Sequence, residues 1–279
     1  PRIVVATPPR RDGTVHPTVL VAAAECGVGE IYRVGGAQAV AALAFGTQTI
    51  PRVDKIVGPG NAYVMEAKRA VFGVVGIDNL AGPSEAAIIA DESAPMRFVA
   101  ADLLAQAEHS GDNVVALLTP HEPLIDAVAA EIERLLSQLS RADVIEQSLA
   151  ECGALVLVES LEQAADLVNV LAPEHLQLMV EDPIALLSHL EGAGAIFIGP
   201  FSPVPLGDYL AGPSHVLPTN RSARFSSGLS VSDFVTTSSI IWSSRAATLA
   251  AVPDVVALAE AEGLTAHAEA MRVRENTSV

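Results

Sequence analysis

Two side chains that could bind a metal ion lie three residues apart in the sequence. Gln106 and His109 fall in a run that predicts a helix over residues 94–110, with Ser93 as its N-cap. A spacing of three puts both side chains on one face of a helix. A histidine beside an oxygen ligand suits a borderline metal such as zinc. On spacing alone, however, an ordinary helix surface is the favoured alternative.

A carboxylate and an imidazole are adjacent where a strand over residues 176–180 is predicted to begin. Glu174 and His175 can both transfer protons near neutral pH once their surroundings shift their pKa values. Adjacent residues on an extended chain point to opposite faces, so the two side chains need not contact each other. The alternative, a solvated glutamate beside a capping histidine, stays open.

A long segment over residues 199–233, dense in Pro, Ser and Gly, carries two further polar candidates, Asp208 and His215. We expect this segment to be a loop, and loops of this length inside a compact domain are usually functional. Glycine and proline around the two residues favour a backbone shaped to hold them, although an ordinary polar loop fits the same composition. His267, near the C-terminus, is by itself typical of a surface histidine.

Two glycine-rich turns, at residues 35–38 and 58–61, each follow a predicted strand and open a predicted helix. Such turns expose backbone N–H groups that can bind an anion at the N-terminus of a helix. Neither matches the G-x-G-x-x-G fingerprint of dinucleotide-binding proteins, which weakens that interpretation. Two such turns side by side in one sheet would strengthen it to some degree.

Strands and helices alternate along most of the chain. In the first part, strands are predicted over residues 3–6, 31–34, 55–57 and 74–77, and helices over 17–26, 37–45 and 61–71. A second series has strands over 86–90, 114–118, 154–158, 176–180 and 195–198, and helices over 94–110, 124–139, 161–170 and 183–190. A Ser-rich run over 235–243 and two helices follow. This alternation, with strands that are apolar throughout, predicts two α/β units with parallel sheets.

Composition and charge narrow the range of functions. The 279 residues are 50% hydrophobic and carry a formal net charge of −17, so the chain can fill a packed core and repels phosphate backbones and anionic membranes. Its two cysteines, Cys26 and Cys152, make neither a disulfide framework nor a four-thiolate zinc site. No apolar run reaches the length of a transmembrane helix. We therefore expect a cytoplasmic protein that binds neither nucleic acid nor membrane.

These motifs together resemble the histidinol dehydrogenase family over essentially the whole chain and in the family's order. The runs that carry the resemblance are VGGAQAVAALAFGT, VDKIVGPGNAYVMEAKR, GIDNLAGPSEAAIIAD, LLAQAEHS, LAPEHLQL, PLGDYLAGPSHVLPT and GLTAHAEAMRVR. They are long and unusual in composition, which makes the resemblance specific. The resemblance also implies an N-terminal segment, with part of the second α/β unit and a tyrosine at the nucleotide site, that this sequence does not contain.

The resemblance implies two incomplete Rossmann-like units with parallel sheets and a C-terminal helical extension. We place the first unit, on the NAD side, at residues 1–84. The second unit, with the metal and acid/base residues, is placed at 85–225, and the extension that reaches the partner subunit at 226–279. The implied assembly is therefore an intertwined homodimer.

The implied activity is the last step of histidine biosynthesis, in which L-histidinol is oxidised through the aldehyde to L-histidine with two NAD and a bound zinc ion. The implied zinc ligands, which also contact the substrate, are Gln106, His109, Asp208 and, from the partner subunit, His267. Further implied substrate contacts are Ser84, His175, His215 and Glu262. The implied contacts to NAD are Gln38 and Asn61, and the implied acid/base residues are Glu174 and His175.

The two oxidation steps make different demands on the acid/base pair. Removal of the hydroxyl proton in the first step suits His175, whereas activation of the water that attacks the aldehyde suits Glu174. Zinc would mainly orient the imidazole and the amine of the substrate rather than generate hydroxide. Two other interpretations stay open. One is a truncated or inactive homologue that binds a metal and a small molecule, and the other is a dehydrogenase of another amino alcohol.

Overall fold

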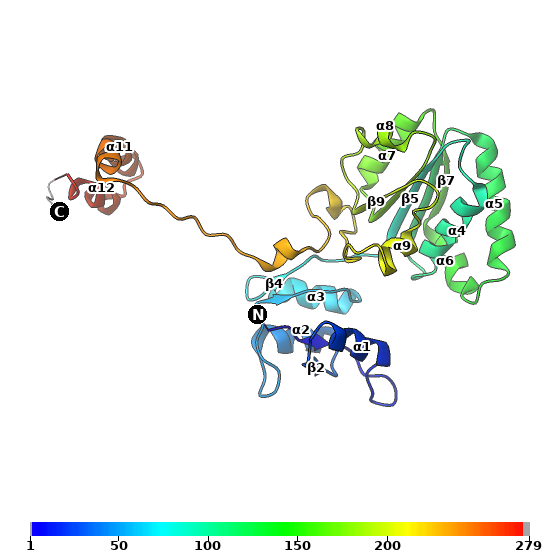
Figure 1. The fold of residues 1–279 in the computed structure, drawn as a ribbon, viewed down its shortest axis with the longest axis horizontal. Coiled ribbons are helices and arrows are strands. Elements are labelled where there is room, and N and C mark those ends of the chain that lie inside the picture. Colours follow the sequence, from blue (N-terminus) through cyan, green and yellow to red (C-terminus); the bar gives the residue numbers. More distant parts are fainter. Residues whose placement is uncertain (1, 276–279) are drawn as a thin grey trace. The chain divides into compact units, whose positions relative to one another are not determined.

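The computed structural model describes residues 2–275, which divide into two compact units (Figure 1). The first unit extends to Phe234 and the second begins at Val235. The α/β class with parallel sheets is confirmed, because all the strands paired within residues 2–275 run parallel to their neighbours. The boundaries expected after residues 84 and 225 stay predictions.

The N-terminal part contains two small parallel sheets rather than one. β1 (Val5–Ala6) pairs with β2 (Ile31–Tyr32), and β3 (Lys55–Ile56) pairs with β4 (Gly76–Ile77). The two glycine-rich turns at residues 35–38 and 58–61 therefore follow strands of different sheets. The strands are short because proline or glycine follows β1 and β3 closely, and neither continues a strand well.

Three helices connect these short strands. α1 (Pro17–Glu25) links β1 to β2, α2 (Gly36–Phe45) follows β2, and α3 (Ala62–Val71) links β3 to β4. α2 and α3 pack against each other. The core that they share consists of Val40, Leu43, Ala44, Ile56, Val71 and Val75.

A five-stranded parallel sheet forms the larger part of the first unit. Its strands are β5 (Glu85–Ala90), β6 (Val114–Thr119), β7 (Gly153–Leu157), β8 (His175–Met179) and β9 (Ala195–Ile198). Their order in the sheet is β7-β6-β5-β8-β9. The chain first builds outward from β5 through β6 to β7, and then crosses back to add β8 on the other side of β5. The sheet therefore has its topological switch point between β5 and β8.

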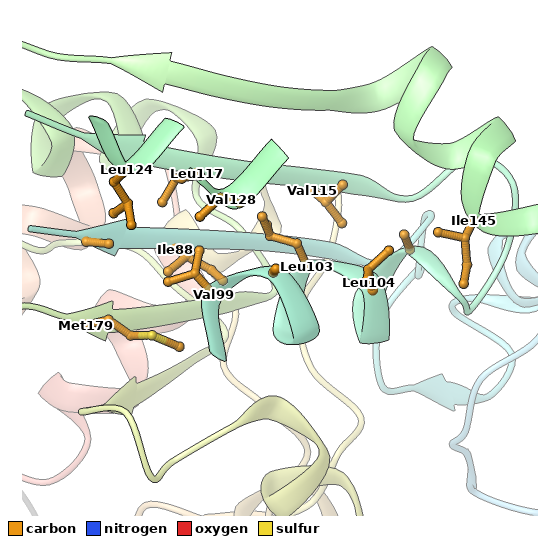
Figure 2. Packing of buried hydrophobic residues seen from close by; sticks show 13 residues of the cluster. Ile88, Val99, Leu103, Leu104, Val115, Leu117, Leu124, Val128, Ile145 and Met179 are labelled. Carbon is orange, nitrogen blue, oxygen red and sulfur yellow. The ribbon is translucent and has the colours of Figure 1, made fainter. Parts of the chain in front are cut away.

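Helices cover both faces of this sheet, as the continuous apolar strands predict. α4 (Met96–Ala107), α5 (Glu122–Leu136) and α6 (Ala142–Cys152) lie on one face, and α7 (Leu161–Leu171) and α8 (Pro183–Leu187) lie on the other. Figure 2 shows the first face, where Val99 and Leu103 of α4 pack against Ile88 of β5. Leu176 and Leu178 of β8 point to the opposite face.

The helix that carries Gln106 is shorter than expected. It begins after Pro95 without a side-chain cap, and Ser93 instead donates its hydroxyl to the Asp91 carboxylate, so Ser93 is not the N-cap. It ends at Ala107, so His109 lies in the turn that follows. The prediction that Gln106 and His109 share one face of a helix is therefore wrong.

In the first unit, two helices were not expected from the sequence. α6 exposes most of its surface and fully buries only Ile145 among its apolar residues, so its apolar stripe is too narrow to stand out. α9 (Val204–Tyr209) lies within the segment expected to be a loop, and short 3-10 turns follow at Ser222–Arg224 and Val231–Phe234. Pro205 is compatible with α9 because the first turn of a helix does not use that backbone N–H.

The second unit is helical where it is regular. Its helices are α10 (Arg245–Ala250), α11 (Val252–Ala261) and α12 (Thr265–Arg272), and α11 packs against α12. Residues 235–244 have no regular structure, and the side chains of Ile240, Ile241 and Trp242 are each more than 90% exposed. Within residues 2–275, none of the helices is long and apolar enough to cross a bilayer.

Candidate active site

The predicted acid/base residues lie where β5 and β8 begin, side by side in the five-stranded sheet. Glu85 is the first residue of β5 and His175 is the first residue of β8. The register pairs Ala86 with His175. Parallel pairing of these two strands therefore brings the GPSE run and the PEHL run together at the end of the sheet where both strands begin.

Glu174 is buried, with 7% of its surface exposed. Its Oε2 accepts a hydrogen bond of 3.3 Å from the backbone N–H of Glu85, and its carboxylate also hydrogen-bonds with the Ser84 side chain. Burial raises the pKa of Glu174 to about 7, although the hydrogen bonds from Ser84 and Glu85 act in the opposite direction. The negative charges of Glu85 and Asp208 raise the pKa further. Glu174 is therefore a carboxyl group that titrates near neutral pH.

His175 is also buried, with 3% of its surface exposed. Its Nδ1 lies 3.6 Å from the nearer carboxylate oxygen of Glu174, and its Nε2 lies 3.9 Å from Oδ1 of Asp208. Burial lowers the pKa of His175 to about 4, and the Asp208 charge only partly offsets this effect. The imidazole is thus neutral at pH 7, and neither ring nitrogen hydrogen-bonds to another group of the described chain.

α9 brings Asp208 to this edge of the sheet. Gly207, the preceding residue, lies so close to Phe197 of β9 that a Cβ atom would come within 2.6 Å of the Phe197 ring. The Phe197 ring also lies beside His175, with ring centroids 5.9 Å apart. The absence of a side chain at Gly207 therefore lets α9 approach β9 closely, and this approach places the Asp208 carboxylate near His175.

Gln106 and His109 lie at the end of α4. The Gln106 side chain is 1% exposed, and neither its amide oxygen nor its amide nitrogen has a hydrogen-bond partner in the described part of the chain. Asn113 holds the following turn, because its Nδ2 donates to the carbonyl oxygens of Gln106 at 3.1 Å and Ser110 at 2.7 Å. His109 is exposed but close enough to His175 for its charge to lower the pKa of that residue.

The buried side-chain amide of Gln106 lacks the hydrogen bonds that such a group normally makes. A buried amide without hydrogen bonds is costly, and such a group in a folded protein calls for a ligand, a water molecule or an ion. Residues 2–275 contain no group of three or more His, Cys, Asp or Glu side chains arranged to hold a metal ion. Of the implied zinc ligands, Gln106, His109 and Asp208 belong to the first unit, and His267 belongs to the second. Amide oxygen, imidazole and carboxylate are ligand types that suit zinc.

The residues implied to contact NAD lie outside this cluster. Gln38 is exposed on α2. Asn61 is also exposed, and its side-chain oxygen accepts a hydrogen bond of 3.2 Å from the backbone N–H of Val64, so it caps α3. Asn61 therefore has a structural role, and its amide nitrogen is left to face solvent.

Asp208 and His215 line a common cavity of about 980 Å³. Most of its wall is apolar, with Ile196 and Ile198 of β9 and Leu206 of α9 among the lining residues. His215 itself is exposed. The cavity lies along β9, the edge strand of the sheet, and contains enough space for a small organic molecule.

Glu262 and His267 are both exposed and lie in the second unit. Glu262 is the C-cap of α11, and His267 is in the first turn of α12. Their roles as contacts to substrate and metal stay predictions.

Sequence reasoning missed three polar residues around the cluster, of which Glu85 and Gln177 are buried and Asp102 is partly buried. Glu85 is 7% exposed and accepts hydrogen bonds from the backbone of Glu174 and Asn220, and burial raises its pKa. Gln177 on β8 is 1% exposed. Asp102 on α4 hydrogen-bonds with the Gln177 side chain, and burial raises its pKa. A glutamine within a strand of otherwise apolar residues was the signal available in the sequence.

Comparison with known proteins gives consistent matches. The family model described as histidinol dehydrogenase matches residues 1–275. A histidinol dehydrogenase from Moorella thermoacetica is 57% identical over 273 residues, which cover 98% of this chain and 64% of that relative. One from Geobacillus kaustophilus is 55% identical, with 98% and 64% of the two chains covered. The crystal structure of histidinol dehydrogenase from Elizabethkingia anophelis matches with a TM-score of 0.94 and 40% identity, over 98% of this chain and 63% of that one. This chain thus spans somewhat less than two thirds of these relatives.

Proposed function

The chain belongs to the histidinol dehydrogenase family, and from this premise we propose that it carries the acid/base groups of an enzyme that oxidises L-histidinol through the aldehyde to L-histidine with two NAD. The observation that carries the proposal is the buried cluster at the start of β5 and β8. There Nδ1 of His175 lies 3.6 Å from the Glu174 carboxylate, and Nε2 of His175 lies 3.9 Å from the Asp208 carboxylate. A dehydrogenase that acts on an alcohol and then on an aldehyde needs such proton-transfer groups.

His175 accepts the hydroxyl proton of the alcohol in this proposal. Its low pKa keeps the imidazole unprotonated at pH 7, and both ring nitrogens lack a partner within the described chain. Once protonated, the imidazolium faces the carboxylates of Glu174 and Asp208. The Asp208 charge stabilises the imidazolium while the proton is held.

Glu174 activates the water that attacks the aldehyde. Only the second oxidation consumes a water molecule, so only that step needs a base beside the aldehyde carbon. A pKa of about 7 suits a carboxylate that must accept a proton and release it again near neutral pH. The hydrogen bonds from the Glu85 backbone and the Ser84 side chain hold this carboxylate in place.

Gln106, His109 and Asp208 would hold zinc together with His267 of the partner subunit. The unpartnered, buried amide of Gln106 supports this ligand set, because zinc would supply the partner that the amide lacks. When bound, zinc would anchor the imidazole and the amine of the substrate and so orient the carbinol carbon. The substrate would also contact Ser84, His175, His215 and Glu262.

Gln38 and Asn61 would contact NAD, which supplies the hydride acceptor. Both side chains are exposed at turns that open helices, where backbone N–H groups can face a phosphate. The amide nitrogen of Asn61 is free to donate to a ligand because only its oxygen caps α3.

A homodimer with an intertwined C-terminal extension completes the proposal. In the single chain, Ile240, Ile241 and Trp242 are almost fully exposed just before the helices of the second unit. A run of large apolar side chains is rarely left in water, so a second copy would cover it. In this arrangement His267 and Glu262 would reach the site of the partner.

The test is NADH absorbance on addition of L-histidinol and NAD to the protein in its natural full length, loaded with zinc. We expect two NADH for each histidinol. Binding of zinc and histidinol without NADH formation would overturn the proposal in favour of a binding module. NADH formation from other amino alcohols but not from histidinol would point to another dehydrogenase of this class.

A further inference from the structure

Gln177 is an unusual residue for its position. It lies in the middle of β8, between two strands of the sheet, and is 1% exposed. The next residue on the same face of the strand, Met179, belongs to the apolar core beneath α4. An apolar side chain at residue 177 would fill the same space in the core without the free-energy cost of burying an amide.

The Gln177 amide contacts two segments other than its own strand. Its Nε2 donates to the carbonyl oxygen of Ser202 at 3.4 Å, and its side chain hydrogen-bonds with the Asp102 carboxylate. Its Oε1 is buried without a hydrogen-bond partner in residues 2–275. The amide therefore links β8 both to α4 and to the segment that leads into α9.

Each of these contacts lies close in sequence to a site residue. Asp102 precedes Gln106 by one turn of α4, so the two side chains share a face of the helix. Ser202 stands just before α9, which carries Asp208. His175 is two residues before Gln177 on β8, and side chains with this spacing point to the same face of a strand.

We propose that Gln177 is a positioning residue, which holds α4 and α9 against β8 and so sets the distance between Gln106 and Asp208. The inference rests on the proposed function, in which these two residues hold zinc. α4 and α9 also contact each other directly, so the separation of the two ligands depends on how both elements are held. Partners that support metal ligands from behind commonly change metal affinity or activity by about 10–100-fold when they are replaced.

The test compares four proteins: the unmodified full-length enzyme, Gln177→Leu, the swapped pair D102N/Q177E, and Thr119→Val. Gln177→Leu keeps the volume and removes both hydrogen bonds. The swapped pair reverses donor and acceptor between residues 102 and 177 and so keeps the link to α4. Thr119→Val is the matched control, because Thr119 is fully buried on β6 and its hydroxyl accepts one hydrogen bond, from the backbone of His121.

Two readouts are needed, zinc affinity by chelator competition and amide hydrogen exchange of residues 204–209 in the metal-free protein. Gln177→Leu should weaken zinc binding by about 10–100-fold and speed exchange in α9. The swapped pair should recover only part of the zinc affinity, because the carboxylate at residue 177 cannot donate to the Ser202 carbonyl, and Thr119→Val should match the unmodified enzyme in both readouts. If Gln177→Leu folds poorly, the single change Gln177→Glu replaces it, since it places two carboxylates together and should be partly rescued by adding Asp102→Asn, which restores the contact with residue 102 but not the donor to Ser202.

Unchanged zinc affinity and unchanged exchange in Gln177→Leu would overturn the inference. Equal zinc affinity in Gln177→Glu and in D102N/Q177E would overturn it as well, because the contact with Asp102 would then have no effect on the ligands. Failure of the proposed function gives a different result, in which the unmodified enzyme neither binds zinc nor forms NADH. In that case, slower amide exchange of α9 in the unmodified enzyme than in Gln177→Leu would still support the positioning role. Equal exchange in the two proteins would refute it.

Discussion

Predicted site residues lie both where β5 and β8 of the five-stranded sheet begin and near the two small N-terminal sheets. They are buried in the first region and exposed in the second. At the edge of the large sheet, Glu174 and His175 are buried and their pKa values are strongly shifted. In the N-terminal part, Gln38 and Asn61 are exposed, and the side chain of Asn61 is used as a helix cap.

This difference shows that the structure of one chain indicates a binding site more clearly from buried polar groups than from exposed ones. Burial keeps Gln106 and His175 away from bulk water, so their unpartnered atoms indicate a bound ligand, water molecule or ion. Exposed groups are satisfied by water and give no such sign. The N-terminal part buries its polar groups elsewhere, in the Lys68–Asp78 ion pair, whose side chains are 1% and 2% exposed.

The largest effect is expected from His175→Asn. In the proposed mechanism the proton of the alcohol passes to this residue and later transfers also use it, so loss of the imidazole should slow both oxidation steps by about 10²–10⁴-fold. The measurement is the rate of NADH formation with histidinol and, separately, with histidinal. A change below about threefold in both rates would mean that the histidine only supports the turn before β8.

A stability effect without a chemical one is expected from Lys68→Met in the N-terminal part. Lys68 donates to Oδ1 of Asp78 at 2.6 Å, and Asp78 in turn accepts a hydrogen bond from the backbone N–H of Gly58. Removal of the lysine leaves a buried, unpaired carboxylate and should lower the free energy of unfolding by about 3–5 kcal/mol. The measurement is the free energy of unfolding from urea titration of the variant and of the unmodified protein.

The neighbouring ion pair supplies the control for this experiment. Arg69 and Glu66 are 2.9 Å apart but are 62% and 65% exposed. Arg69→Met should therefore cost less than about 1 kcal/mol. If Lys68→Met and Arg69→Met lower the free energy of unfolding by similar amounts, the buried ion pair does not stabilise this part of the chain more than the exposed one.

An intermediate effect is expected from Gly207→Ala. The added Cβ would meet the Phe197 ring at 2.6 Å, so α9 would have to move and Asp208 would move with it. We expect activity and zinc affinity to fall by about 10–100-fold. Gly29→Ala is the control, because its Cβ would have no neighbour within 4 Å. Equal behaviour of the two variants would show that α9 tolerates displacement.

The smallest effect is expected at Asn61, where two roles can be separated. Asn61→Ala should lose the cap of α3, at a cost of about 0.5–2 kcal/mol in unfolding free energy. Asn61→Ser keeps a capping oxygen but removes the amide nitrogen. It should therefore retain stability while NAD affinity, measured by calorimetry, falls by about 2–10-fold. Unchanged NAD affinity in both variants would remove Asn61 from the cofactor site.

Much of the large sheet could be predicted from the sequence because its strands are continuous apolar runs with glycine or proline between them. All five of its strands occur where apolar runs were found, within two residues at each end. α6 and α9 could not be predicted in this way. α6 has too narrow an apolar stripe, and α9 is a short helix inside a Pro- and Gly-rich segment, where composition favours a loop.

The residues proposed for the site could be named from the sequence, but the contacts that support them could not. Gln106, Glu174, His175 and Asp208 come from motifs, whereas their surroundings depend on tertiary contacts that a sequence pattern does not contain. Gly207 is required by its approach to Phe197, and Gln177 by contacts with α4 and the segment before α9. The end of α4 before His109 likewise depends on Asn113, which binds the carbonyl oxygens there.

The separate roles of Glu174 and His175 predict a specific pH dependence. Burial raises the pKa of Glu174 to about 7, so the carboxylate form that activates water becomes more populated as the pH rises through 7. The kcat/KM for histidinal should therefore fall by about tenfold for each pH unit below 7 in the unmodified enzyme. Glu174→Gln should abolish this dependence.

The most direct measurement is the ratio of the two half-reactions in Glu174→Gln, with the full-length, zinc-loaded enzyme and with histidinol and histidinal supplied separately. If Glu174 activates the water, oxidation of histidinal should slow by about 10²–10⁴-fold, while the first NADH from histidinol forms at a rate much closer to that of the unmodified enzyme. Equal losses in both half-reactions would contradict the division of roles between Glu174 and His175.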